Sequence, residues 1–469
     1  MTAPAGTVRA AAAPLPPLAA PGPAPRPDVA TLTADSGLRV VAARGGAVPL
    51  VELRLVIPFD GGPAPVGATA ELLAATLLGG TRAHGRAALD DRLAEAGAQL
   101  TARIDPERLV LSGSAPADGL PRLLDVLADS LTGPAFTAAD LAEQRARLRQ
   151  RIDVARRLPK NAVREALLLR CYGAHPLTRE TPGSALVAAV EDAAVRELAR
   201  ERLVPRGATL VVVGSADPAR TAELAARALA GWRSERTATA PTAPGPVRGT
   251  GLGLLPRPGA RQAQVRLAAA ALPRTDPGYE ALLLANLVLG GYFSSRLVAE
   301  LRERRGWVYH AQSTVEEHSA GDALAVIGFD TDTRTAGAAL RAARDELAGI
   351  AGPHPPTDRE IEDARSYAAG ITAVSLSGQR GLAHFLLTLE TAGLDHHWLP
   401  EHLDRLRAVG PDAVRAAAAR HFAPDRFTGV LAGDPGALTA EDLAAFPESA
   451  VPEAAVPEPA VPEAAGTGS

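Results

Sequence analysis

Cysteine is nearly missing from this 469-residue chain, which contains only Cys171. An intrachain disulfide is therefore impossible, and a zinc site built from several thiolates is excluded. A lone cysteine fits a reducing compartment, and we expect the protein to be cytoplasmic.

The chain also lacks a strong excess of charge and a long apolar segment. Its 49 basic and 53 acidic residues leave a formal net charge of −4, which gives no basic surface for nucleic acid or an anionic membrane. No uninterrupted apolar stretch approaches the roughly 18 residues that a membrane helix needs. The Ala/Pro-rich start lacks the charged and apolar regions of a signal peptide. We therefore expect no nucleic-acid partner and no membrane partner.

Three segments have little pattern of ordered structure. Residues 1–28 form a Pro/Ala-rich tail, residues 233–250 a small-residue linker, and residues 441–469 a tail that repeats Val-Pro-Glu. Regular proline prevents a packed core, so both tails are predicted to be disordered. Two domains are then expected, at residues 29–232 and 251–440.

These two long segments resemble each other. Glu71–Gly80 (ELLAATLLGG) matches Leu282–Gly291 (LLLANLVLGG), and Leu203–Pro218 (LVPRGATLVVVGSADP) matches Phe422–Pro435 (FAPDRFTGVLAGDP). A repeat of this length indicates a duplicated domain rather than a solenoid.

Each copy shows the same order of expected elements. Two strands come first, followed by a helix, with predicted bounds of Leu38–Ala42, Val51–Ile57 and Val66–Leu78 in the first copy and Gly253–Leu255, Ala263–Ala268 and Gly278–Leu289 in the second. Further strands and two long helices precede a final strand. This pattern predicts an α+β protein of two homologous domains, each a mainly antiparallel sheet with helices on one face.

One segment of the second copy carries a specific resemblance. Gly290–Tyr309 (GGYFSSRLVAELRERRGWVY) resembles the C-terminal domains of the insulinase/pitrilysin peptidase family. Asp35–Val41 resembles the family's opening strand, Gly79–Thr81 the stretch after its zinc helix, and Tyr172–Leu177 its short Gly-x-His-Pro-Leu turn. The similarity spans about residues 30–440 and implies one half of the family's clamshell.

The zinc site of that family is not matched. Its His-x-x-Glu-His motif, registered on Gly80-Thr81, falls on Glu71–Ala75, so that Glu71, Ala74 and Ala75 replace the two histidines and the general base. The third ligand position falls near Arg151. Because a catalytic zinc needs three protein ligands, we predict no metal and no cofactor in this chain and expect zinc in a partner subunit.

A second group of possible ligands is weaker. His396, His397, Glu401 and His402 are dense in sequence, but Pro400 interrupts the helical spacing that ligands would need. This pattern favours a solvated turn.

The resemblance implies that Arg302 and Tyr309 are the family's substrate-holding pair. The arginine guanidinium is permanently charged and holds several N–H donors in a fixed plane. The tyrosine side chain offers a neutral hydroxyl donor. Donors aimed at a developing oxyanion contribute about 3–4 kcal/mol each. The competing interpretation is that Arg302 pairs with a nearby surface acid and Tyr309 is a core aromatic.

The local pattern places the pair as follows. A helix that begins near Ser294 buries a stripe at Leu297, Val298 and Leu301, with Arg302 at its edge. Gly306 ends the helix. A strand over Trp307–Val315 then places Tyr309 on the same face as Trp307 and Ala311.

These observations predict a chain that is inactive alone. The first hypothesis is the non-catalytic subunit of a heterodimeric zinc peptidase, similar to the non-catalytic chains of bacterial and mitochondrial processing peptidases. Its partners would be a homologous subunit carrying His-x-x-Glu-His and a peptide substrate, which family members add as a strand to a sheet edge. The second hypothesis is a structural or peptide-binding scaffold. A third, proteolysis through Cys171, lacks a designated base.

Overall fold

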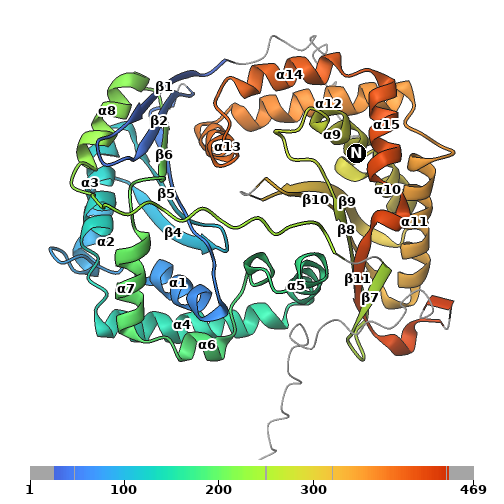
Figure 1. Ribbon diagram of the computed structural model, residues 1–469, viewed down its shortest axis with the longest axis horizontal. Coiled ribbons are helices and arrows are strands. Elements are labelled where there is room, and N and C mark those ends of the chain that lie inside the picture. The colour runs from blue at the N-terminus through green and yellow to red at the C-terminus, as the bar shows by residue number, and fades with distance from the viewer. Residues whose placement is uncertain (1–25, 47, 249–250, 319–320, 440, 443–469) are drawn as a thin grey trace, which may run out of the picture.

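The structure, a computed structural model, describes residues 26–442 except 47, 249–250, 319–320 and 440 (Figure 1). The predicted tails at 1–28 and 441–469 lie almost wholly outside these residues. The chain forms two halves that face each other, and the segment that joins them crosses the front of the molecule (Figure 1).

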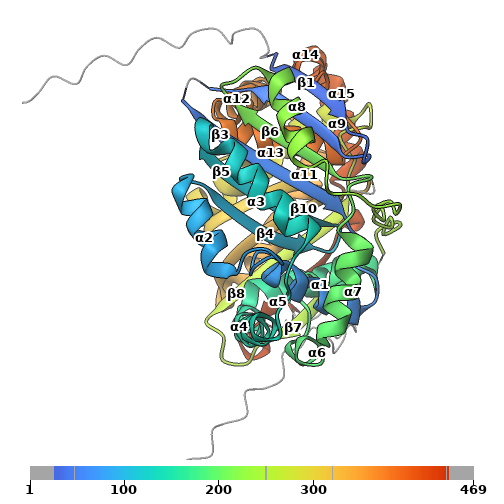
Figure 2. The ribbon, with the colours of Figure 1, turned by 90° about the vertical axis from the view of Figure 1, so that its left-hand side faces the viewer.

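The first half contains a six-stranded sheet in the order β1-β2-β6-β3-β5-β4. Its strands are β1 (Asp28–Thr33), β2 (Arg39–Arg44), β3 (Leu50–Pro58), β4 (Gln99–Asp105), β5 (Arg108–Pro116) and β6 (Thr209–Gly214). Its helices are α1 (Ala64–Thr76), α2 (Arg86–Glu95), α3 (Leu120–Thr132), α4 (Ala138–Arg157), α5 (Pro159–Tyr172), α6 (Ser184–Ala188), α7 (Asp192–Arg202) and α8 (Pro218–Ala228). Figure 2 shows α2, α3 and α8 over the outer face of this sheet.

The second half contains a five-stranded sheet in the order β7-β11-β8-β10-β9. Its strands are β7 (Gly251–Pro256), β8 (Gln262–Ala270), β9 (Val308–Glu317), β10 (Ala323–Asp332) and β11 (Thr428–Gly433). Its helices are α9 (Tyr279–Asn286), α10 (Arg296–Val298), α11 (Ala336–Ala351), α12 (Asp358–Leu376), α13 (Gln379–Thr391), α14 (Trp398–Ala408) and α15 (Pro411–His421), with π-helical turns at Leu287–Gly291 and Ala299–Arg304.

The duplication expected from the sequence is visible in the strand order. The order β2-β6-β3-β5-β4 repeats as β7-β11-β8-β10-β9, and β1 is an addition to the first sheet. In the first sheet β6 pairs in parallel with β2, and in the second sheet β11 pairs in parallel with β7. The other strand pairs, such as β3–β6 and β8–β11, are antiparallel. The predicted α+β class with two mainly antiparallel sheets is confirmed.

Alternation along the strands divides the core into layers. Leu53, Leu55 and Leu210 point outward into a core shared with α1, α3 and α8. Val56 and Val211, on the opposite face of the same strands, point inward. This two-faced burial explains why the central strands are almost continuously apolar.

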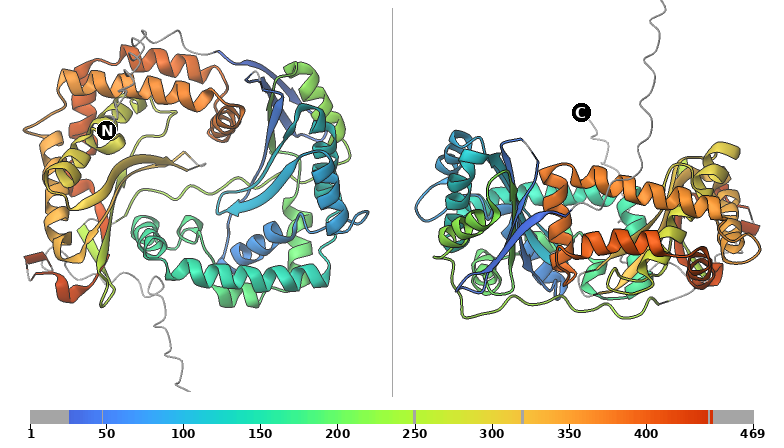
Figure 3. Two further views of the ribbon diagram at one scale, coloured as in Figure 1. Left: turned by 180° about the vertical axis from the view of Figure 1, so that it is seen from behind. Right: turned by 90° about the horizontal axis from the view of Figure 1, so that it is seen from above.

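Each half lends a helix to the inner face of the other sheet. Helix α5 of the first half packs on β8 and β11, and α13 of the second half packs on β3 and β6. Figure 1 shows both helices between the two sheets, and Figure 3 shows them from behind. Ion pairs Arg39–Glu390 at 2.6 Å and Arg164–Glu316 at 3.0 Å join the halves beside these helices. The sequence predicted helices on one face of each sheet and did not indicate this exchange.

One helical segment, Tyr279–Arg304, is long and apolar enough to cross a membrane by length and composition. It lies in the core of the second half, with 61% of its most apolar window buried. Leu282, Leu284 and Leu297 are fully buried there. Its hydrophobicity is therefore accounted for by packing in this core.

Candidate functional site

The segment that carries Arg302 is anchored by the apolar stripe predicted from the sequence. Leu297, Val298 and Leu301 are 0%, 4% and 0% exposed, so this side of the helix faces the core. The helix α10 continues through the π-helical turn Ala299–Arg304 and ends at Gly306, whose φ is +65°. A left-handed φ suits glycine because it has no Cβ, and the predicted helix end is confirmed.

The predicted face of Tyr309 is wrong. Tyr309 is 89% exposed, whereas Ala311 is 1% exposed. The register between β9 and β10 shifts at this point. Ala311 pairs with Phe329 and Val308 pairs with Thr331, so β9 contains one residue more than β10 between these two pairs. An extra residue in one strand reverses the alternation of side chains, and this irregularity turns Tyr309 out of the core.

Arg302 and Tyr309 lie together with a third side chain, Phe293. The guanidinium carbon of Arg302 lies 4.6 Å from the centre of the Phe293 ring and 5.6 Å from the centre of the Tyr309 ring. Its ionic contact, with the adjacent Glu303, is 3.5 Å long. Cation–π contacts of this length orient a guanidinium without neutralising it. The competing interpretation is therefore wrong for Tyr309, which is not a core aromatic, and right for Arg302 in that it pairs with the surface acid Glu303. This single 3.5 Å contact at Nε leaves the terminal guanidinium nitrogens of Arg302 for a ligand.

Phe293 was not predicted as a site residue. It is 65% exposed, unusual for a large apolar side chain, and lies between the turn Leu287–Gly291 and α10. The turn before Phe293 lies close to β9 and requires glycine at position 290. A Cβ on Gly290 would lie 2.8 Å from the backbone nitrogen of Ser313. The signal in the sequence was an aromatic residue inside the Gly-Gly to Ser-Arg-Leu motif.

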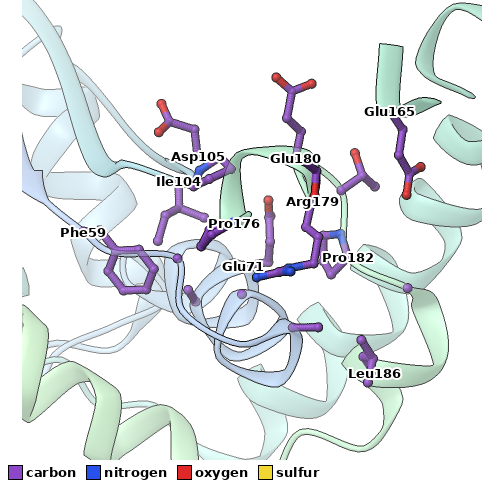
Figure 4. A pocket seen from close by; sticks show the side chains of 18 of the residues that line it. Phe59, Glu71, Ile104, Asp105, Glu165, Pro176, Arg179, Glu180, Pro182 and Leu186 are labelled. Carbon is purple, nitrogen blue, oxygen red and sulfur yellow. The ribbon is translucent and has the colours of Figure 1, made fainter. Parts of the chain in front are cut away.

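One of the degenerate zinc positions, Glu71 of α1, lines a separate cavity of about 350 Å³ in the first half (Figure 4). Ala74 is buried, and Ala75 is partly buried behind it. Arg151 of α4 is exposed, and its charge acts on Glu71. The structure thus brings the four predicted positions into one region.

These residues do not fit a zinc ion. Ala74 and Ala75 offer no ligand atom, and Arg151 would repel a cation. Burial raises the pKa of Glu71 to about 7, which Arg151 only partly opposes and Asp105 reinforces. A zinc-binding carboxylate must be ionised, whereas burial disfavours the ionised form of Glu71. Across the residues that the structure describes, no group of three or more His, Cys, Asp and Glu side chains could hold a metal.

Apart from Pro176, the rest of the cavity wall comes from residues that the sequence analysis did not single out. Figure 4 shows Ile104, Pro176, Leu186 and Arg179 around Glu71. Arg179 donates to the Gly62 carbonyl oxygen at 2.5 Å, which closes the wall. Pro176 belongs to the Gly-x-His-Pro-Leu turn noted in the sequence, so this turn forms part of the cavity.

The prediction that the histidine-rich cluster is a solvated turn is right for His396 and His397, which lie in a turn before α14 with His397 exposed, and wrong for His402. His402 is 5% exposed within α14. Its Nδ1 lies 2.9 Å from Glu280, which also accepts from Arg405, and its ring stacks on Trp398 at 4.2 Å. Pro400 is tolerated because it lies in the first helical turn, where its missing N–H is not needed. His402 therefore belongs to a structural network rather than to a ligand site.

Cys171 is also structural. Its side chain is fully buried, and burial raises the pKa of its thiol to about 12. The thiolate is the nucleophilic form of cysteine, so this residue is not activated for catalysis.

Comparisons with known proteins agree with this geometry. Residues 68–184 match the family described as Insulinase (Peptidase family M16), and residues 190–367 match the family described as Peptidase M16 inactive domain. A protein of Streptomyces coelicolor described as an uncharacterized zinc protease is 27% identical over 368 residues, which cover 76% of this chain and 79% of that protein. A protein of Mycobacterium tuberculosis with the same description is 26% identical over 322 residues, or 68% of this chain and 72% of that protein.

Solved structures show the same fold. A peptidase M16 inactive domain from Pseudomonas fluorescens superposes with a TM-score of 0.79 at 23% identity, covering 87% of this chain and 98% of that one. A protease from Helicobacter pylori superposes with a TM-score of 0.77 at 14% identity, covering 87% and 99%.

Proposed function

Because this chain belongs to the insulinase (M16) family of peptidases, we propose that it is the zinc-free, non-catalytic subunit of a heterodimeric zinc peptidase. In this role it binds peptide and stabilises the transition state for a homologous partner that carries His-x-x-Glu-His. The observation that carries the proposal is the contrast between its two sites. Glu71, Ala74, Ala75 and Arg151 cannot hold zinc, whereas Arg302 and Tyr309 lie together and remain accessible.

The chemistry assigned to this chain needs no metal of its own. The partner's zinc would supply an activated water. Arg302 would donate to the peptide carbonyl as negative charge develops on its oxygen, and the Tyr309 hydroxyl would donate to the same region. The burial of Leu297 and Leu301 beneath them and the contact with Phe293 would limit reorganisation of the donors during reaction.

The experiment is to purify this chain from its native cell extract, identify the chains that come with it and assay zinc-dependent peptide cleavage. A stoichiometric partner with His-x-x-Glu-His, and cleavage that needs both chains, are expected. In the reconstituted complex, Arg302→Ala and Tyr309→Phe should each lower kcat by about 100-fold, the loss typical of one oxyanion donor.

Two variants serve as controls. Arg359→Ala removes a 92% exposed arginine on α12, and Tyr367→Phe removes the hydroxyl of a 38% exposed tyrosine. Both should leave kcat unchanged. Isolation of this chain alone or as a homodimer without activity would reject the helper role and favour a structural or peptide-binding scaffold.

A further inference from the structure

A cavity of about 410 Å³ lies on the outer side of the first half. Its wall is formed by Arg82 after α1, by residues 131–136 between α3 and α4, by α7, and by residues 231–234 after α8. Figure 2, which looks onto this side, shows α3, α7 and α8 on the same face. Among the described residues, this cavity shares none with the Glu71 cavity, so the two are separate sites.

The charged side chains of this cavity are all basic. Arg82, Arg196, Arg200 and Arg233 line it, and no Asp or Glu does so in the part of the chain that the structure describes. Arg200 pairs with Glu197 of the same helix at 2.7 Å. The other three arginines form no ion pair with a described residue. The wall therefore carries an excess of positive charge, which attracts anions.

These three guanidinium groups are held by backbone carbonyl oxygens. Arg82 and Arg196 donate to carbonyl oxygens at the end of α3 and in the segment that follows it, each at 2.9 Å. Arg233 donates through Nε to the Ala230 carbonyl oxygen, also at 2.9 Å. A carbonyl oxygen orients a guanidinium but carries no full negative charge, and each guanidinium has five N–H donors. Donors therefore remain for a ligand on all three arginines.

Two backbone features of the segment between α3 and α4 fit the wall to these cations. A Cβ on Gly133 would lie 2.9 Å from Nε of Arg82, so glycine leaves the space that this guanidinium occupies. Phe136 has a φ of +42°, which bulky residues rarely adopt, and its carbonyl oxygen accepts the hydrogen bond from Arg196. Backbone strain of this kind is concentrated at functional sites, which supports a binding role for the cavity.

The rest of the wall is largely apolar. Leu131, Leu203 and Trp232 line it and are buried, and Pro134 lies beside them. The indole N–H of Trp232 donates to the Leu203 carbonyl oxygen at 2.9 Å, so the ring offers only apolar surface to a ligand. A ligand in this cavity meets both cations and carbon, an environment that suits an organic molecule with an anionic group.

The number of uncompensated arginines indicates which anionic group fits. A phosphate monoester presents three terminal oxygens and a charge of about −1.5 to −2 at pH 7. A carboxylate presents two oxygens and a single charge. Guanidinium groups form bidentate, charge-assisted hydrogen bonds with phosphate oxygens. Three guanidinium groups therefore match a phosphate better than they match a carboxylate.

We propose that this cavity binds a small organic phosphate monoester. The phosphate group is bound by Arg82, Arg196 and Arg233, and the organic group packs on the apolar wall at Leu131 and Trp232. Neither zinc nor a partner subunit takes part, so this inference goes beyond the proposed function and is independent of it.

The test uses the full chain and phenyl phosphate as the probe, titrated by isothermal titration calorimetry. Inorganic phosphate and benzoate are titrated in the same buffer for comparison. Phenyl phosphate should bind about tenfold more tightly than inorganic phosphate, because its ring buries apolar surface. It should also bind about tenfold more tightly than benzoate, because it forms more hydrogen bonds to charged groups.

Variants locate the site. Arg82→Gln and Arg196→Gln should each weaken the binding of phenyl phosphate by about tenfold, the loss expected for one hydrogen bond between charged groups. Gly133→Ala retains every charge but places a Cβ against Arg82, and it should also weaken binding. Arg122→Gln, at an exposed position on α3, is the matched control and should leave the affinity unchanged. Circular dichroism checks that each variant folds.

Three results would overturn the inference. Equal affinity for inorganic phosphate would exclude an ester as the preferred ligand, and equal affinity for benzoate would exclude a phosphate preference. Binding that survives both arginine variants, or no saturable binding, would exclude this cavity as the site. The helper role stands after any of these results, because the assay contains neither zinc nor a partner. Conversely, failure to find a zinc-bearing partner leaves a positive binding result intact.

Discussion

Arg302 lies with its guanidinium carbon 4.6 Å from the centre of the Phe293 ring, an aromatic side chain that is itself 65% exposed. An exposed phenylalanine gains little from its own burial, so its contact with Arg302 is the feature that gives it a role. The arrangement orients a cation at the surface while leaving its charge available.

Replacing Phe293 by alanine should weaken catalysis by a complex of this chain with its zinc-bearing partner. An exposed cation–π contact contributes about 0.5–1 kcal/mol, so kcat/KM should fall about two- to fivefold. Phe293→Tyr retains the ring and should restore most of the activity. A rise in KM with unchanged kcat, or unchanged kinetics, would show that Phe293 does not position Arg302 for catalysis.

Replacing Leu386 by alanine should strongly destabilise the fold. This residue of α13 is 2% exposed and packs on the inner face of the first sheet, so it joins the two halves. A buried Leu→Ala change costs about 2–5 kcal/mol, measurable by urea denaturation. Val374→Ala, at a position 68% exposed on α12, is the control and should change the free energy of unfolding by less than about 0.5 kcal/mol. Similar losses in both variants would contradict the exchange of helices between the halves.

Glu71→Gln should stabilise the chain at alkaline pH. The pKa of Glu71 is raised from 4.5 to about 7 in the folded state by burial, so the folded chain holds this proton more tightly than the unfolded chain. The resulting penalty is absent below pH 4.5, grows as the pH rises towards 7 and is complete above it, at up to roughly 3 kcal/mol.

Urea denaturation at pH 4 and at pH 8 measures this difference. The variant and the parent should be similar at pH 4, and the variant should be more stable at pH 8. Glu95→Gln, at an exposed position on α2, should show no such pH dependence. A stabilisation that is equal at both pH values would contradict the burial of an ionisable Glu71.

Cys171 should resist alkylation in the folded chain. Its side chain is fully buried and its thiol has a pKa of about 12, so the reactive thiolate is scarce and inaccessible at pH 8. Iodoacetamide labelling, followed by mass spectrometry, should be more than about tenfold faster in urea than in buffer. Rapid labelling of the native chain would reopen a role for this thiol.

The sequence was sufficient for features that depend on local pattern. The duplication follows from matching segments such as Glu71–Gly80 and Leu282–Gly291, and the paired sheets share one strand order. The buried stripe Leu297, Val298 and Leu301 follows from helical spacing, because residues on one face of a helix recur at fixed intervals. The helix end at Gly306 follows from the freedom of glycine at positive φ. The poor fit of Glu71–Ala75 to zinc follows from the sequence because only Glu71 among these residues has a ligand atom.

Tertiary structure alone decided the remaining features, because each depends on contacts between distant segments. The exposure of Tyr309 depends on the irregular pairing of β9 with β10, which a single strand's alternation does not reveal. The burial of His402 depends on Glu280, a residue 122 positions away. The packing of α5 and α13 on the opposite sheets exists only once the two halves meet. Local sequence therefore determined the elements and their apolar faces, whereas long-range packing decided which side chains are buried and which are exposed.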